Sequence, residues 1–184
     1  MRFIDSRFGT WRGAIRLGLS YAEQMIGQAA IRTHGPEPVR RIVFVCQGNI
    51  CRSAFAETVA RGMGLPVASF GLATRTGSPA DPGAIRAALA LGVDLKRHRT
   101  TARPDFSVQS GDLLLGMETR QLRRIAADPD LTPVARNLLG TWAQPPVPHL
   151  HDPFQLSDAY FLTCFRRISS AVDGLAAEFS DLRI

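Results

Sequence analysis

Residues 43–53 read VFVCQGNICRS, an apolar run followed by a short polar loop and an Arg-Ser pair. The β-branched and aromatic residues of 41–45 predict a buried strand. Residues 53–61 place apolar side chains at helical spacing and predict a helix. In a strand, tight loop and helix of this order, successive backbone N–H groups converge on one point, where the helix N-terminus adds positive charge. The stretch therefore predicts an anion-binding loop at the start of a helix.

The same loop carries a nucleophile and a cation. Gly48 and Asn49 tolerate the positive φ that an inward-curling loop requires. Cys46 lies where the field of the loop would favour a thiolate at neutral pH. Arg52 can donate two parallel hydrogen bonds to the oxygens of a bound tetrahedral anion. A thiolate, a cradle for an anion and a guanidinium together predict phosphoryl transfer to cysteine.

The string Cys46-x-Gly48-Asn49-x-Cys51-Arg52-Ser53 resembles the phosphate loop of the low-molecular-weight protein tyrosine phosphatases. The resemblance covers roughly residues 41–180. It implies that Cys46 attacks phosphorus and that the loop and Arg52 hold the phosphoryl oxygens. It implies no metal and no other cofactor, since the loop and Arg52 stabilise the charge. The phosphate-binding residues that it implies are Gln47, Gly48, Asn49, Ile50, Cys51, Arg52 and Ser53.

The family also places an Asp-Pro pair on a late loop as the proton donor to the leaving oxygen. Three such pairs occur, beginning at Asp81, Asp128 and Asp152. The first predicts a helix start and the second a helix end. Asp152, which precedes the last predicted helix and is followed by aromatic Phe154, is therefore the expected general acid. The resemblance implies that Asp152 then activates the water that hydrolyses the cysteinyl phosphate.

Four further residues have implied roles around the loop. Ser53 would hydrogen-bond the thiolate; it could also be a plain helix N-cap, and both roles can hold at once. Asn49 would hold the shape of the loop. His98 resembles a histidine that supports the loop from behind, and a surface histidine is the alternative. Cys51 could trap Cys46 as a reversible disulfide, and a small packed residue is the alternative.

The remaining candidates for chemistry are two histidines and one cysteine. His149 and His151 lie close to Asp152, but a bare His-x-His spacing gives little support for a metal site. We expect two solvated loop histidines that titrate near neutrality. Cys164 falls in the last predicted helix and is expected in the core.

Strands and helices alternate after residue 40, which predicts an α/β fold. We expect a four-stranded parallel sheet flanked by helices on both faces, with the phosphate loop after the first strand. Ligands in such sheets bind beyond the carboxyl ends of the strands, where Cys46 would lie. The remaining strands are expected within residues 65–70, 112–117 and 135–142, and the helices within 82–91, 118–127 and 157–179.

Residues 1–40 are expected to form an N-terminal extension, and residues 41–184 the phosphatase-like domain. An apolar stripe at three- and four-residue steps predicts an amphipathic helix, and residues 33–38 predict a linker. We expect the stripe to pack on the domain or on a second subunit. The alternatives are a basic helix that binds a membrane surface or a partner through residues 8–29, and a cleaved transit peptide. The stripe consists of Phe8, Trp11, Ile15, Leu19, Ala22 and Ile26.

The composition bounds location and partners. The 184 residues are 45% hydrophobic and contain no apolar run long enough to span a membrane. Three cysteines, two of them in the loop, fit a reducing cytoplasm. The net charge is +6, and residues 1–41 alone hold seven arginines against three acidic residues. Because residues 1–41 carry a net charge of +4 and residues 42–184 only +2, we expect no nucleic-acid partner.

We expect a phosphomonoester hydrolase that acts on phosphotyrosine in proteins or on small aryl phosphates. Thiol-dependent arsenate reductases share the loop and are the first alternative. They need a further cysteine pair, and this chain offers only Cys51 and Cys164 besides Cys46. A non-catalytic anion-binding module is the second alternative, although binding alone requires neither a thiol nor an acid.

Overall fold

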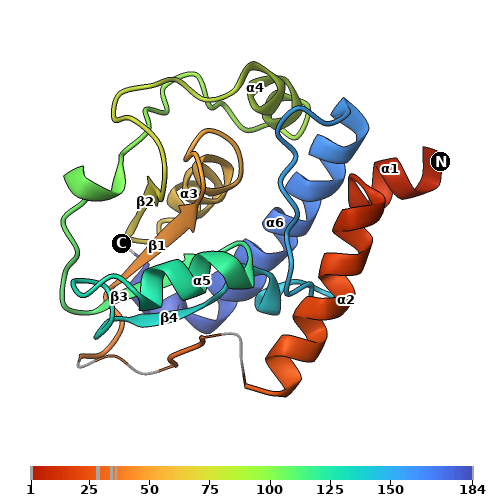
Figure 1. Ribbon diagram of the computed structural model, residues 1–184. Helices are drawn as coiled ribbons and strands as arrows, with labels where there is room; N and C mark the ends of the chain where they lie inside the picture. Colours follow the sequence, from red (N-terminus) through yellow and green to blue (C-terminus); the bar gives the residue numbers. More distant parts are fainter. Residues whose placement is uncertain (1, 28–29, 34, 36, 184) are drawn as a thin grey trace.

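The computed structural model describes residues 2–27, 30–33, 35 and 37–183 (Figure 1). Within these residues four parallel strands form one sheet in the order β2-β1-β3-β4. The predicted sheet is therefore confirmed, and β1, which leads into the loop, occupies an inner position. The strands are β1 (Arg41–Cys46), β2 (Val67–Gly71), β3 (Asp112–Gly116) and β4 (Ala135–Leu138).

Helices cover both faces of the sheet. The helices α3 (Arg52–Gly62), α4 (Pro82–Leu89) and α6 (Asp158–Glu178) lie on one face, and α5 (Thr119–Ala126) lies on the other. Since β1 is buried on both sides, its sequence is continuously apolar rather than alternating.

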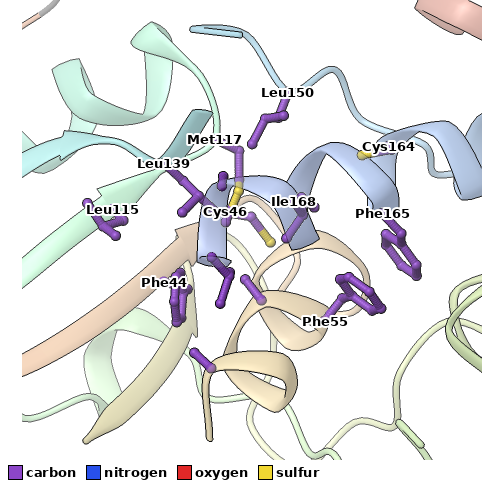
Figure 2. Close-up of a cluster of buried hydrophobic side chains, with 14 of the residues drawn as sticks. Phe44, Cys46, Phe55, Leu115, Met117, Leu139, Leu150, Cys164, Phe165 and Ile168 are labelled. Atoms are coloured by element: carbon purple, nitrogen blue, oxygen red, sulfur yellow. The ribbon is translucent and has the colours of Figure 1, made fainter. Parts of the chain in front are cut away.

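The larger core cluster joins β1 to α3 and α6. Phe44 of β1, Phe55 of α3 and Phe165 of α6 all belong to this cluster, and Figure 2 labels all three. The Phe55 and Phe165 rings stack with their centroids 4.0 Å apart. Each fully buried side chain of this size contributes roughly 1.5–3 kcal/mol. The packing therefore fixes α3, and with it the loop before α3, against the sheet.

Side chains cap the N-termini of α4 and α6 but not that of α3. The Asp81 side chain accepts from the backbone N–H of Ala84, and Ser157 accepts from that of Tyr160. The N-cap of α3 is Cys51, without a side-chain cap bond. The interpretation of Ser53 as a plain N-cap is therefore wrong, because its hydroxyl bonds elsewhere.

The N-terminal segment forms two helices, α1 (Arg2–Phe8) and α2 (Trp11–Met25), which break at Gly9 with φ 75°. They lie beside α6 and the loop before it (Figure 1). The expected packing of the apolar stripe on the domain is wrong, since Trp11, Ile15 and Leu19 are 61%, 52% and 57% exposed. The inner face of α2 instead carries the buried small residues Gly13 and Ser20, and Leu17, which packs against the larger core cluster.

Among the described residues between α2 and β1, the backbone of Arg32 forms a bridge with that of Arg136. The predicted linker spans residues 33–38, of which His34 and Pro36 lie outside the described residues. None of the helices described here has the length and apolarity required to cross a bilayer.

Candidate active site

The loop 47–51 connects the carboxyl end of β1 to α3 and borders a cavity of about 170 Å³. The loop before α6 closes the cavity from the other side. The site therefore lies at the sheet edge where the sequence predicted it. The lining residues are Cys46, Gln47, Gly48, Ile50, Cys51, Arg52, Asp152 and Phe154.

The backbone of the loop has the shape of an anion cradle. Asn49 has φ 55°, in the left-handed region that asparagine tolerates. Its backbone N–H donates to Cys46 Sγ at 3.2 Å. The backbone N–H groups of Gly48, Ile50 and Cys51 have no acceptor among the described residues, and all three residues line the cavity. Free amides at the edge of a cavity provide donors for the oxygens of a bound anion.

A chain of hydrogen bonds sets the proton positions around the thiol. Asn49 Oδ1 accepts from the backbone N–H of Thr101 at 2.8 Å, which fixes the orientation of the amide. Asn49 Nδ2 must then donate to Ser53 Oγ at 2.8 Å and to Ser69 Oγ at 2.7 Å. The Ser53 hydroxyl is left to donate to Cys46 Sγ, 3.0 Å away. Two hydrogen-bond donors are therefore aimed at the Cys46 sulfur.

His98 supports the loop from the side away from the cavity. Its Nε2 lies 2.7 Å from the carbonyl oxygen of Asn49, which can only accept, so Nε2 carries the proton. The side chain is 7% exposed, and its Nδ1 lies 3.9 Å from Glu57 Oε2. The alternative of a surface histidine is therefore wrong.

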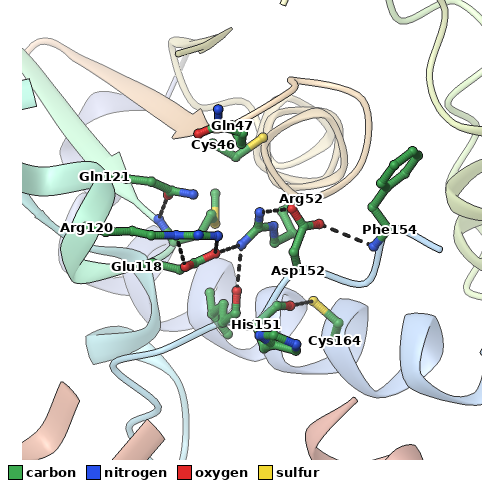
Figure 3. A network of polar contacts seen from close by, with 12 residues as sticks. Cys46, Gln47, Arg52, Glu118, Arg120, Gln121, His151, Asp152, Phe154 and Cys164 are labelled. Carbon is green, nitrogen blue, oxygen red and sulfur yellow. Dashed lines mark hydrogen bonds and ion pairs between the residues drawn. The ribbon is translucent and has the colours of Figure 1, made fainter. Parts of the chain in front are cut away.

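Arg52 is buried between two carboxylates (Figure 3). Its Nη1 donates to Glu118 Oε1 at 2.5 Å and to the carbonyl of Leu150 at 2.9 Å. Its Nη2 lies 2.5 Å from Asp152 Oδ2. Burial alone lowers the pKa of Arg52, but the charges of Asp152 and Glu118 outweigh burial and raise it. The guanidinium therefore stays charged, and its buried Nε has no hydrogen-bond partner among the described residues.

Glu118 is a site residue that sequence reasoning missed. It follows β3 and was assigned only to the start of a helix, yet it is buried and pairs with Arg52 and Arg120. Burial alone raises the pKa of Glu118, but the Arg52 charge lowers it to about 2. One signal could have found it, because an acidic residue just beyond a buried parallel strand lies at the same sheet edge as Cys46.

Asp152 reaches the cavity from the loop before α6. Besides its ion pair with Arg52, its Oδ1 accepts from the backbone N–H of Phe154 at 3.3 Å. The Phe154 ring is 44% exposed and forms an apolar wall of the cavity. The structure thus brings together the expected nucleophile, cation and acid. On the opposite rim, Gln47 Oε1 accepts from Arg124 Nη1 at 2.9 Å.

The expectation of two solvated histidines is wrong. His149 is only 3% exposed, its ring stacks on His151, and its Nε2 has no partner among the described residues. Burial lowers the pKa of His149 to about 4 and also lowers the pKa of His151. His151 contacts the extension, where its Nε2 lies 3.4 Å from Thr10 Oγ1. Both histidines therefore serve as packing residues of the loop that carries Asp152.

Cys51 and Cys164 are free, buried thiols, and burial raises the pKa of both. Cys164 lies in the core as expected, where its thiol donates to the carbonyl of His151 at 3.6 Å. Cys51 lines the cavity together with Cys46. Among the described residues no group of three or more His, Cys, Asp or Glu side chains could hold a metal ion.

A family model described as low molecular weight phosphotyrosine protein phosphatase matches residues 41–182. The chain belongs to this family. The predicted resemblance is thereby confirmed, and α1 and α2 lie outside the matched region.

Named relatives agree with this assignment. The "Probable low molecular weight protein-tyrosine-phosphatase EpsP" of Ralstonia solanacearum is 37% identical over 91 residues, which are 48% of this chain and 63% of that protein. The match thus spans less than two thirds of that relative. Wzb of Salmonella typhi, a low molecular weight protein-tyrosine-phosphatase, is 36% identical over 65% of this chain and 81% of its own. The tyrosine phosphatase Wzb of Escherichia coli K30, solved with sulphate, superposes with a TM-score of 0.65 and 28% identity, covering 77% of this chain and 99% of its own.

Proposed function

We propose that the protein hydrolyses phosphotyrosine in proteins through a cysteinyl-phosphate intermediate on Cys46. The observation that carries the proposal is the convergence of a thiol, a guanidinium and a carboxyl on one small cavity, in Cys46, Arg52 and Asp152. Membership of the phosphatase family supports it, as do relatives named as protein-tyrosine-phosphatases. The sulphate in the K30 Wzb structure is a tetrahedral anion, the shape that this loop would bind.

In the first step the Cys46 thiolate attacks phosphorus, and the S–P bond forms as the ester P–O bond breaks. Asp152, in its acid form, gives its proton to the leaving oxygen. The free loop amides and Arg52 hold the three non-bridging oxygens, whose charge they stabilise. In the second step Asp152 takes a proton from water, the oxygen of that water attacks phosphorus, and the S–P bond breaks. The departing thiolate is stabilised by the Ser53 hydroxyl and the Asn49 amide.

The depth of the cavity favours phosphotyrosine. Cys46 is only 2% exposed, so a phosphoryl group must reach it on a long side chain. A tyrosine ring supplies that length and presents a flat apolar face to Phe154, which lines the cavity. The shorter phosphoserine would leave its phosphoryl group above the loop. Small aryl phosphates satisfy the same geometry and are convenient substrates.

Cys51 is proposed as a redox partner of the nucleophile. Because burial raises its pKa, Cys51 remains a thiol while Cys46 is the reactive sulfur. A peroxide that oxidises Cys46 to a sulfenic acid would allow Cys51 to condense with it, forming a disulfide and releasing water. A thiol reductant would restore both cysteines. This exchange would protect Cys46 from irreversible oxidation.

We assign residues 41–184 to the catalytic domain and residues 1–40 to an extension that contributes none of the proposed catalytic residues. We place the activity in the cytoplasm, whose reducing thiol pool would keep all three cysteines free. The reaction as proposed uses no cofactor.

The test is hydrolysis of p-nitrophenyl phosphate without added metal, compared between wild type, Cys46→Ser and Asp152→Asn. We expect Cys46→Ser to abolish turnover and Asp152→Asn to reduce it about 10²-fold or more. Asp128→Asn is the matched control, since Asp128 also precedes a proline but pairs with Arg103 away from the cavity. A phosphotyrosyl peptide should be turned over faster than a phosphoseryl peptide of the same sequence.

Turnover that survives Cys46→Ser would refute the mechanism. A folded wild type without activity on any aryl phosphate would refute the proposed function. It would favour an arsenate reductase, assayed with arsenate and a thiol donor, or an anion-binding module.

A further inference from the structure

The outer face of α2 is apolar and exposed. Six of the eight large hydrophobic side chains exposed in the described residues lie between positions 11 and 26. Trp11, Ile15 and Leu19 follow each other at four-residue steps and so share one side of the helix. Ile26, 64% exposed, extends the same side just beyond the helix end. A contiguous apolar surface of this kind marks an interaction site. The six residues are Trp11, Ile15, Leu19, Tyr21, Met25 and Ile26.

The fold does not need Trp11, Ile15, Leu19 or Ile26, because other residues attach α2 to the domain. Gly13 and Ser20 are buried on the inner face. A Cβ on Gly13 would clash with the backbone oxygen of Phe8 and lie 3.0 Å from the His151 ring, so only a glycine permits both close approaches. Tyr21 donates to the carbonyl of Pro146 at 2.5 Å, and Glu23 pairs with Arg123 at 2.8 Å. The apolar side chains therefore point outward from a helix that is already anchored.

The border of the apolar face is positively charged. Arg12 and Arg16 are exposed beside it, and the Arg12 guanidinium lies 5.6 Å from the centroid of the Trp11 ring. Glu23 is the only acidic residue of α2, and Arg123 neutralises it. A second copy of the chain is therefore a poor occupant, since it would bring arginines against arginines. Apolar anchors, an interfacial tryptophan and flanking arginines fit a surface with an apolar interior and anionic headgroups.

We propose that this face of α2, formed by Trp11, Ile15, Leu19 and Ile26 with Arg12 and Arg16, binds the surface of a membrane that contains anionic lipid. The helix lies in the headgroup region and does not span the bilayer. Its inner face contacts His151, which directly precedes Asp152. Binding thus keeps the Asp152 loop near the bilayer. If the proposed function holds, the substrates reached most easily are phosphotyrosines on membrane-associated proteins.

The experiment is flotation of the full chain with vesicles of phosphatidylcholine alone or of phosphatidylcholine mixed with phosphatidylglycerol. We expect wild type to float with the anionic vesicles only. Each buried Ile or Leu should contribute at least tenfold to binding, so Ile15→Ser combined with Leu19→Ser should abolish flotation. Arg12→Gln combined with Arg16→Gln should weaken binding more than tenfold. Leu89→Ser is the matched control, because Leu89 is 61% exposed on α4 and should leave flotation unchanged.

The readout is independent of catalysis, so loss of the proposed phosphatase activity would not affect it. Circular dichroism spectra that match wild type would show that the exposed-residue variants still fold. Failure of wild type to float with anionic vesicles would overturn the proposal. Sedimentation of wild type as a dimer that Ile15→Ser and Leu19→Ser dissociate, without vesicle binding, would assign the face to a second copy instead.

Discussion

His149 should make the protein less stable in mild acid. The His149 ring belongs to the loop that carries Asp152 and is buried. Burial lowers its pKa from 6.5 to about 4. Between these values the unfolded chain binds a proton at this position and the folded chain does not. Stability linked to His149 is therefore complete above the unfolded pKa and is lost as the pH falls towards the folded pKa.

The magnitude follows from the two pKa values. At about pH 5 the unfolded histidine is almost fully protonated while the folded one remains neutral. This pH lies about 1.5 units below the unfolded pKa. At 1.36 kcal/mol per unit, protonation therefore stabilises the unfolded chain by about 2 kcal/mol relative to the folded one. His149→Phe keeps an aromatic ring but does not titrate. The difference in unfolding free energy between wild type and His149→Phe should thus shift by about 2 kcal/mol between about pH 7.5 and about pH 5.

The assay is urea unfolding followed by tryptophan fluorescence at the two pH values. Val147→Ala is the control, since Val147 is buried in the same loop but the change removes no titrating group. Val147→Ala should lower the free energy of unfolding by the same amount at both pH values. A wild-type to His149→Phe difference that stays constant with pH would refute the reasoning, because it would mean that His149 is protonated equally in both states.

Three further predictions concern the surroundings of the cavity. Glu118→Gln removes one of the two carboxylates that neutralise the buried Arg52 guanidinium. It should lower the free energy of unfolding, measured in urea at neutral pH, by about 3 kcal/mol. A change within error of zero would mean that this ion pair does not stabilise the fold. Gly13→Ala should lower the free energy of unfolding, because its Cβ would clash with the backbone oxygen of Phe8 and lie 3.0 Å from the His151 ring. Gly18→Ala in the same helix meets nothing within 4 Å and should instead stabilise by about 0.5–1 kcal/mol; equal effects of the two alanines would contradict the proposed contact. Cys51→Ser should keep full activity in reductant but lose it irreversibly in peroxide, measured by recovery after dithiothreitol; equal recovery in wild type and variant would exclude Cys51 as the redox partner.

The catalytic loop could be predicted from sequence because its parts are contiguous. Cys46, Asn49 and Arg52 lie within seven residues, and a strand and a helix fix their relative positions. The parallel sheet was equally predictable, since its buried strands are apolar and alternate with helices. Asp152 was predicted only through the family resemblance, because two other Asp-Pro pairs compete with it on local grounds.

Other parts of the site depend on contacts that no local pattern encodes. Glu118 meets Arg52 because β3 lies next to β1, a neighbour relation between segments 66 residues apart. His149 is buried because α2 packs against the loop that carries His149. The sequence around His149 is polar and rich in proline and does not indicate burial. The face of α2 that contacts the domain was predicted wrongly. Periodicity identified an apolar face, but the residues that turn inward are Gly13, Leu17 and Ser20.

The most direct test of the central claim is to look for the phosphoryl group on Cys46. Wild type and Asp152→Asn would be mixed with p-nitrophenyl phosphate, quenched during turnover and digested for peptide mass mapping. The account predicts one added phosphoryl group on the peptide that contains Cys46, none in Cys46→Ser, and none on the peptide that contains Cys164. Turnover without phosphorylated Cys46, or a phosphoryl group on another residue, would contradict it.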